Sequence, residues 1–322
     1  MESLFEREKA RLLSHPSVTR WADLEGCLRT VLASPRHDWE LPSLACKAVG
    51  GDPQAVGPAA AALICEQLSI TLVDDVLDED PRGLHNTIGS GRVANISLAL
   101  VGLAFELVKD LQVEPWRKLA IIMSLASMEL ETAYGQHLDV TEPRTEESYW
   151  KILQRKSTPY YAVALSVGAL AGGASLEISQ KVSEIGGLIG EITQIYDDLT
   201  DALQTPANPD WNRPGANLAI LYAISAPHPD QEAFKGDLAT IADDKTLRHA
   251  QGLLIRSGAV SYCAYHVAQR VRAARALVHR TGFADPDPLL TLLSSQAAPL
   301  SRLLSELGVS RPLDLLTEEH EV

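Results

Sequence analysis

Six aspartates in two short stretches are the residues of this chain whose types and spacing best suggest chemistry. They are Asp74, Asp75, Asp78, Asp197, Asp198 and Asp201. The first three form DDVLD and the last three form DDLTD. On a helix, positions i and i+4 share a face, so each stretch points a pair of carboxylates the same way. Buried like charges are unfavourable unless a cation compensates them.

Carboxylate oxygens with open coordination positions favour Mg²⁺, which binds through a few carboxylates plus substrate phosphates. We therefore expect the two stretches to face each other across a cavity and to hold Mg²⁺. The competing interpretation is a pair of solvated acidic helix ends, which a single DDxxD in an acidic chain would favour. Two copies of the spacing, each flanked by apolar residues, favour the metal site and predict largely buried helices.

The elements that must position these aspartates are helices. Alanine and leucine dominate, alternating β-branched runs are absent, and 3.6-residue periodicity recurs along the chain, which predicts an all-α fold. Helices are expected over Pro58–Leu77 and Leu176–Leu203 for the aspartates. The remaining expected helices are Ser3–Ser14, Arg20–Ala33, Leu41–Val49, Val93–Leu111, Pro115–Tyr134, Glu146–Ala171 (one helix or a kinked pair), Gly215–Ala226, Leu238–Ile255 (broken up), Ala259–Thr281 and Pro286–Leu307. No linker divides residues 1–322, so we expect a single domain.

Composition narrows the function classes. The chain has 322 residues, 46% of them hydrophobic, and a net charge of -14, which disfavours a nucleic-acid partner. Its four cysteines form no CxxC pattern and indicate a reducing compartment. The N-terminus carries charges where a signal peptide needs an apolar run, and the longest apolar tract, Ala162–Ser175, is too short for a membrane span. We expect a cytoplasmic homodimer with no membrane span.

Further motifs occur in a definite order between and around the aspartates. GQHLD contains Gln136 and Asp139, QRKS contains Lys156, and Gln194 precedes the second Asp-rich stretch. PRG after the first stretch contains Arg82, and LAILYA follows the second. With these motifs the sequence resembles the trans-isoprenyl diphosphate synthases, the polyprenyl synthetase family, from about Ala33 to Leu307.

This resemblance implies an antiparallel helical bundle around a central cavity, the isoprenoid synthase fold. It implies that Mg²⁺ held by both Asp-rich stretches grips the diphosphate of an allylic isoprenyl substrate. The catalytic residues would then be Asp74, Asp75, Asp78, Asp197, Asp198 and Lys156. The substrate-binding residues would be Arg82, Gln136, Asp139, Gln194, Ser69, Ile70 and Arg36. No aromatic residue stands at Ser69 or Ile70, so a prenyl chain of fifteen carbons or more is expected.

The chain departs from the family pattern where isopentenyl diphosphate should bind. The family carries GGKRxRP ahead of its first glycine pair, whereas this chain has ASPRHDWELP ahead of Gly50 and Gly51. Only Arg36 keeps a positive charge there, beside Asp38. The loop after DDLTD lacks the usual GK element, and Arg213 is the nearest cation. The half of the site for the allylic diphosphate thus looks intact, and the half for isopentenyl diphosphate looks damaged.

Three functions follow from this pattern. The first is a Mg²⁺-dependent enzyme that ionises an allylic diphosphate and either transfers the prenyl cation to a non-standard acceptor or cyclises it, as a ComQ-like or cyclase-like member of the family. The second is a conventional prenyl diphosphate synthase that uses isopentenyl diphosphate. The third is a non-catalytic subunit of a heteromeric synthase, which the presence of all six aspartates disfavours.

Overall fold

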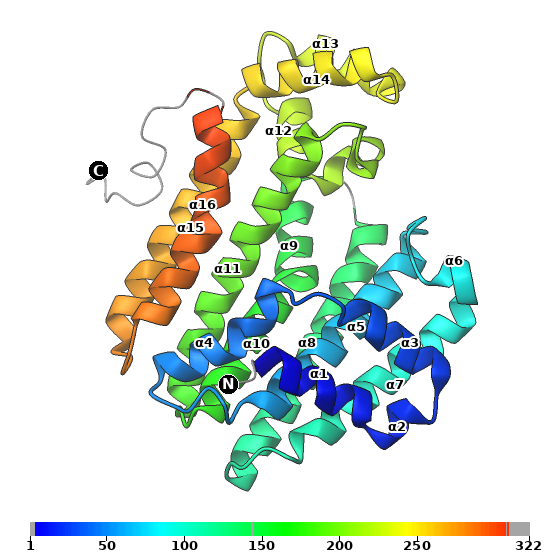
Figure 1. Ribbon diagram of the computed structural model, residues 1–322. Helices are drawn as coiled ribbons and strands as arrows, with labels where there is room; N and C mark the ends of the chain where they lie inside the picture. The colour runs from blue at the N-terminus through cyan, green and yellow to red at the C-terminus, as the bar shows by residue number, and fades with distance from the viewer. Residues whose placement is uncertain (1–3, 143–144, 307, 309–322) are drawn as a thin grey trace. The chain divides into compact units, whose positions relative to one another are not determined.

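The computed structural model describes residues 4–142, 145–306 and 308, and every regular element within these ranges is a helix (Figure 1). The prediction of an all-α fold is confirmed. Contacts within the chain group it into two compact units. Unit 1 comprises Met1–Ala133, Pro159–Gly186 and Val278–Leu289, and unit 2 comprises Tyr134–Thr158, Gly187–Leu277 and Leu290–Val322. The unit borders fall inside helices and not in linkers, so we retain a single domain as a proposal.

Unit 1 contains the N-terminal helices. They are α1 (Leu4–Ser14), α2 (Pro16–Thr19), α3 (Ala22–Val31), η1 (His37–Glu40), α4 (Leu41–Ala48), α5 (Gly57–Leu77), α6 (His85–Ile88), α7 (Ser90–Val108), α10 (Thr158–Ala171) and the first parts of α8 (Pro115–Thr141) and α11 (Leu176–Leu203). Ser3, the predicted first residue of the first helix, lies outside the described residues.

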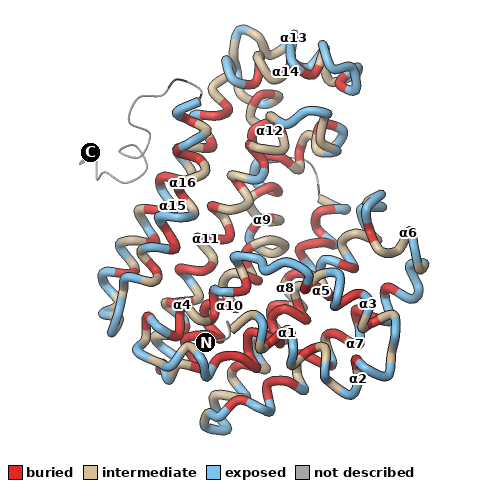
Figure 2. Tube along the Cα trace, in the orientation of Figure 1, coloured by how far each residue is buried: buried red, intermediate tan, exposed pale blue. Residues whose placement is uncertain are grey.

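Helix α5 is the centre of unit 1 and carries the first Asp-rich stretch. Its first turns are buried on all sides, which the alanines of Ala59–Ala62 permit because small side chains let neighbouring helices approach (Figure 2). It packs along α7, and the hydroxyls of Ser69 and Ser97 lie 2.7 Å apart between the two helices. The last turn of α5 therefore projects from a closely packed helix.

Unit 2 contains the rest of the chain. Its elements are α9 (Glu146–Lys156), η2 (Pro209–Asn212), η3 (Pro214–Ala216), α12 (Leu218–Ser225), α13 (Gln231–Asp237), η4 (Leu238–Thr240), α14 (Asp244–Arg256), and most of α15 (Ala259–Thr281) and α16 (Asp287–Glu306), with the second parts of α8 and α11. Helix α11 contributes Ile192, Ile195 and Leu199 to the unit's apolar core. The predicted helix end at Leu307 lies outside the described residues.

Several helix boundaries differ from the expectation. The Glu146–Ala171 segment is the kinked pair α9 and α10, because Pro159 has no backbone N–H to continue the first helix. Helix α13 was not predicted; its single buried aromatic residue, Phe234, anchors an otherwise polar sequence. The glycine signal after the third expected helix is confirmed, since Gly50 has a φ of 84° just past the end of α4.

Helix α8 runs seven residues beyond the predicted end at Tyr134, to Thr141. In the structure Gly135 continues the helix, and a Cβ there would lie 2.4 Å from the backbone nitrogen of Lys156. The absent side chain thus lets α8 touch the junction of α9 and α10. As a result GQHLD lies on a helix.

One described helix, α7, is long and apolar enough to cross a membrane by length and composition. The core helix of a globular unit meets the same criterion. Val93, Ile96 and Leu100 of α7 are buried in unit 1, which is typical of such a helix.

Candidate active site

The first Asp-rich stretch lies at the C-terminal end of α5 in unit 1. Asp74 and Asp75 are half-buried and Asp78 is exposed, so this last turn is more accessible than the sequence predicted. The N–H of Asp78 donates to the carbonyl of Asp74 at 2.8 Å, and the N–H of Asp80 donates to that of Asp75 at 3.0 Å. Glu79 adopts a left-handed φ of 52°, so the helix ends in a Schellman motif with a glutamate where glycine is usual.

Arg82, the predicted diphosphate-binding arginine, is held just after this turn. Its Nη2 lies 2.8 Å from Oδ2 of Asp80, and its backbone N–H donates to Oδ1 at 2.7 Å. These bonds lower the pKa of Asp80 to about 2. Burial raises the pKa of Asp75, and the negative charges of Asp80 and Asp74 raise it further. The turn therefore concentrates negative charge that a cation would stabilise.

Asp198 is the most enclosed residue of the second stretch, in unit 2. It is 1% exposed, and its Oδ2 accepts the hydroxyl of Tyr149 and the N–H of Leu218, each at 2.7 Å. Its Oδ1 accepts the side-chain amide of Gln194 at 2.9 Å. Burial raises the pKa of Asp198 to about 7, although the three donors lower it. This carboxylate is an anchor for α9, α11 and α12.

Asp197 and Asp201 occupy the other side of α11 at positions i and i+4. Asp197 is exposed, yet the atoms around it desolvate its carboxylate enough to raise its pKa to about 6, and the charge of Asp201 raises it further. Asp201 also accepts the side-chain amide of Gln204 at 3.1 Å. Because Asp198 already has three donors, Asp197 and Asp201 are the pair of this stretch best placed to bind a cation.

Asp139, Lys156 and Arg213 form a charged cluster in unit 2. Oδ2 of Asp139 lies 3.1 Å from Nζ of Lys156 and 3.3 Å from Nη2 of Arg213. Asp139 is buried, whereas Lys156 and Arg213 retain solvent contact. Two cations thus contact one carboxylate. All three residues were named from the sequence, but their contact was not predicted.

Gln194 and Gln136, two predicted substrate-binding residues, differ in their partners. The amide oxygen of Gln194 accepts the hydroxyl of Ser157 at 2.8 Å while its nitrogen binds Asp198, so Gln194 joins α11 to the α9–α10 junction. Gln136 is buried, and neither polar atom of its amide has a hydrogen-bond partner among the described residues. A buried amide without partners is unfavourable unless a ligand or water satisfies it.

Arg36, the remaining cation of the damaged motif, lies in unit 1 and is paired with Asp38. Its Nε and Nη2 each lie 3.2 Å from an oxygen of Asp38, and Asp38 also accepts the side-chain amide of Gln67. The indole N–H of Trp39 donates to Gln67 at 2.7 Å. Arg36 lines a cavity of about 450 Å³ that also contains Lys47. The charge of Arg36 is therefore largely neutralised by its own loop.

Ser69 and Ile70, expected to form the floor of the prenyl pocket, lie one turn before Asp74 on α5. Ser69 is buried, and its hydroxyl contacts Ser97 of α7. Ile70 is half-buried. Their role in chain length stays a prediction.

The carboxylates suit a metal that takes only part of its ligands from the protein. Among the described residues, no three Asp, Glu, His or Cys side chains form a complete metal site. Mg²⁺ usually binds one or two carboxylates and completes its octahedron with phosphate oxygens and water, so the pairs in each unit fit it. That the two stretches face each other stays a prediction.

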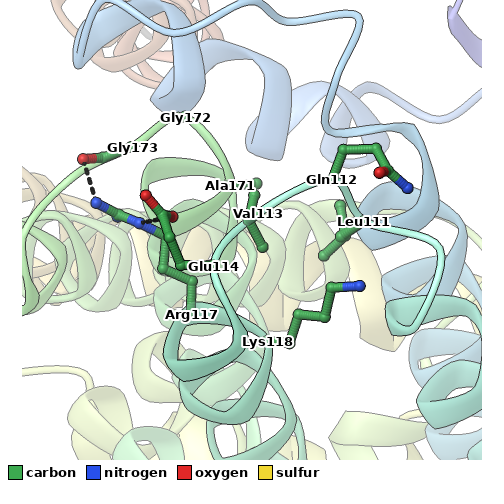
Figure 3. A pocket seen from close by; sticks show the side chains of 9 residues that line it. All are labelled: Leu111, Gln112, Val113, Glu114, Arg117, Lys118, Ala171, Gly172 and Gly173. Atoms are coloured by element: carbon green, nitrogen blue, oxygen red, sulfur yellow. Dashed lines mark hydrogen bonds and ion pairs between the residues drawn. The ribbon is translucent and has the colours of Figure 1, made fainter.

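A separate cavity of about 500 Å³ lies in unit 1, between the α7–α8 loop and the end of α10 (Figure 3). Arg117 lies within it and donates to the carbonyl of Gly173 at 2.8 Å, with further bonds to Leu170 and Ala174. It thereby caps the C-terminus of α10. None of the predicted site residues lines this cavity.

Sequence reasoning missed Tyr149 and Asp80 as parts of the site. Asp80 stands two residues before Arg82, a spacing that permits the observed ion pair. Tyr149 stands seven residues before Lys156, which places both on the same side of α9. Only the spacing within α9 could have suggested Tyr149, because Asp198 is far away in the sequence.

Comparison with known proteins gives a consistent result. The model of the family described as polyprenyl synthetase matches residues 41–246. The geranylgeranyl diphosphate synthase of Methanosarcina mazei is 36% identical over 167 residues, which are 49% of this chain and 52% of that protein. The chain therefore spans about half the length of this relative. The short chain isoprenyl diphosphate synthase of Methanothermobacter thermautotrophicus is 28% identical over 252 residues, 72% of this chain and 76% of that protein.

A solved structure shares the fold. The geranylgeranyl pyrophosphate synthase of Corynebacterium glutamicum, complexed with calcium and isoprenyl diphosphate, superposes with a TM-score of 0.76 at 21% identity. The match covers 92% of this chain and 94% of that chain.

Proposed function

Because the chain belongs to the polyprenyl synthetase family, whose members are prenyltransferases, we propose that it is a Mg²⁺-dependent prenyl diphosphate synthase. In this proposal it ionises an allylic isoprenyl diphosphate and joins the prenyl group to isopentenyl diphosphate, with release of diphosphate and a proton. The names of the two archaeal relatives support this function, which the sequence analysis placed second.

The observation that carries the proposal is the cluster of Asp139, Lys156 and Arg213. Breaking the carbon–oxygen bond of an allylic diphosphate leaves charge on the departing group, and positioned cations stabilise it. Lys156 and Arg213 bring two positive charges to this position, with contacts to Asp139 at 3.1 and 3.3 Å.

The other residues have distinct parts in the proposal. A bound Mg²⁺ supplies charge neutralisation to the leaving diphosphate. Asp74, Asp75 and Asp78 in unit 1, and Asp197 and Asp201 in unit 2, would hold the metal ions. Asp198 keeps α11 in place through Tyr149 and Leu218. Arg82, Gln136 and Gln194 remain proposed contacts of the substrate.

A second candidate, transfer to a different acceptor or cyclisation, is favoured by one observation. Arg36 is bound by Asp38, so the segment that should bind a second diphosphate has little free positive charge. Two diphosphates in one cavity repel each other, and the second needs cations of its own.

One incubation separates the two candidates. The enzyme with Mg²⁺ is given geranyl, farnesyl or geranylgeranyl diphosphate, with and without isopentenyl diphosphate, and both diphosphates and volatile products are analysed. A diphosphate five carbons longer, formed only with isopentenyl diphosphate, supports the synthase. Consumption of the allylic substrate to hydrocarbons or alcohols, unaffected by isopentenyl diphosphate, supports the second candidate. Elongation from farnesyl diphosphate onward would support a pocket for chains of fifteen carbons or more.

We also propose a cytoplasmic homodimer. Exposed apolar side chains form a stripe on α8 at heptad-like spacing: Trp116, Leu119, Met123 and Leu130. Such a stripe can pack against the same stripe of a second copy of the chain, so no other protein is required. The net charge of -14 disfavours the alternative, an anionic membrane surface. Sedimentation of the Leu119→Glu, Met123→Glu variant tests it: a dimer that persists unchanged would exclude this face.

A further inference from the structure

Two glutamates meet inside unit 1, away from the aspartates. Glu66 lies on α5 and is 0% exposed, and Glu129 lies on α8 and is half-buried. The carboxyl groups lie within hydrogen-bonding reach of each other. Glutamate is rarely buried completely without a cationic partner, so this pair needs a physical explanation.

No donor from the described residues reaches these carboxyl oxygens. Both oxygens of Glu66 and Oε1 of Glu129 lack a hydrogen-bond partner when the groups are treated as carboxylates. The hydroxyl of Thr132, one turn beyond Glu129 on the same side of α8, is also buried and unpartnered. A buried, charged carboxylate without hydrogen-bond donors is strongly unfavourable.

The nearby charges do not compensate the pair. Among the described residues, the charge that acts on Glu66 is that of Glu129, and it is repulsive. The neighbouring thiol of Cys65 is buried, which favours its neutral form. Helices α1, α4, α6 and α7 and the short helix η1 also pack against α5, and no cation from their described residues acts on Glu66. Protonation of one carboxyl removes this repulsion and supplies an O–H donor for a hydrogen bond to the other.

We propose that Glu66 is protonated at neutral pH and donates a pH-sensitive hydrogen bond from α5 to Glu129 on α8. The proton is bound on folding and lost when Glu66 ionises at alkaline pH. The inference concerns the stability of unit 1 and holds whatever acceptor the enzyme uses.

The direction of the pH effect follows from the burial of Glu66. Burial, the hydrogen bond to Glu129 and its charge raise the pKa of Glu66 well above its ordinary range. In the unfolded chain a glutamate ionises near pH 4.3. The folded protein therefore holds one more proton above that pH. The stability supplied by the pair is complete below about pH 4.3 and is lost progressively as the pH rises.

Infrared spectroscopy of the unmodified enzyme tests the proposal directly. In D₂O at pH 8, exposed carboxyls are ionised, so a carboxylic-acid C=O stretch reports a protonated buried group. We expect this band in the wild type and its loss in Glu66→Gln. Its absence from the wild type, with only carboxylate bands present, would overturn the proposal without any variant.

Urea unfolding between pH 6 and 9, in EDTA, gives the second test. Relative to Glu66→Gln, the wild-type unfolding constant should rise about tenfold per pH unit, the signature of one linked proton. Glu177→Gln is the matched control, because Glu177 is exposed beside Lys181 and its lowered pKa leaves it ionised throughout this range. A wild type with the same pH slope as Glu66→Gln would refute the protonated pair.

Discussion

The hydroxyl of Tyr149 on α9 donates to Oδ2 of Asp198 on α11 over 2.7 Å, and both side chains are buried. The backbone N–H of Leu218, which begins α12, donates to the same oxygen. One carboxylate of the second Asp-rich stretch thus fixes three helices of unit 2. Its neighbour Asp197 is left facing solvent. Adjacent aspartates therefore serve different purposes, one structural and one available to a metal.

Tyr149→Phe removes one donor from Asp198. We expect the free energy of unfolding to fall by about 1 kcal/mol, the usual net contribution of such a bond. The pKa of Asp198 should rise, because its donors hold it down. Urea denaturation measures the first effect and carboxyl-carbon NMR the second. Tyr265→Phe, at an exposed tyrosine, is the control and should change neither. Equal stability of Tyr149→Phe and wild type would contradict the role of this bond.

The metal-free protein should lose stability as the pH rises through 6 and 7. The folded pKa values of Asp197 and Asp198 are raised to about 6 and about 7, above the value of about 3.9 for an unfolded aspartate. Their contribution is complete below about pH 4 and declines until both are ionised. Urea midpoints in EDTA at pH 4–8, compared with Asp198→Asn, measure this. A stability difference between the two proteins that does not vary with pH would count against it.

Asp197→Ala combined with Asp201→Ala should reduce turnover by two to three orders of magnitude, roughly the loss of several kcal/mol of metal stabilisation. In EDTA the same variant should be at least as stable as wild type, because the removed carboxylates repel each other. Activity of the wild type should vanish in EDTA and return with Mg²⁺. Asp237→Ala, elsewhere in unit 2, is the control for activity. Turnover that survives chelation would exclude the metal mechanism.

Lys156→Ala should slow consumption of the allylic diphosphate about a hundredfold, in line with the loss of one charged donor at a developing anion. The fold should persist, since Arg213 still pairs with Asp139. Lys151→Ala is the control, because Lys151 is on the same helix but pairs with Glu142 at the surface. Steady-state kinetics and thermal unfolding are measured together. A large drop in melting temperature that accompanies the lost activity would assign Lys156 a structural role instead.

Asp38→Asn should improve the use of isopentenyl diphosphate. The change leaves Arg36 without its anionic partner, so its charge becomes available to a second diphosphate. We expect a several-fold lower KM for isopentenyl diphosphate, and no change in the KM for the allylic substrate. Adding Arg36→Ala to Asp38→Asn should abolish the gain. If Asp38→Asn binds isopentenyl diphosphate no better than wild type, Arg36 is not part of the acceptor site.

Local patterns in the sequence determined the helices that carry the site. The 3.6-residue periodicity and the apolar flanks of the aspartates place DDVLD at the end of α5 and DDLTD near the end of α11, as predicted. The order of the motifs was enough to indicate the family. These features depend on residues close together in the sequence, and helix formation is determined mainly by such local interactions.

Contacts between distant segments were decided only by the tertiary structure. Neither the two cations on Asp139 nor the Tyr149 and Leu218 donors on Asp198 could be predicted from spacing, because these partners come from separate helices and loops. The continuation of α8 through Gly135 likewise depends on a distant contact, the close approach of this glycine to the backbone of Lys156. Glu66 stood in the sequence as one acid in an apolar run. Whether such a group contacts a cation, water or another acid depends on the residues of the helix that packs against it. Here the neighbouring residue is Glu129 of α8.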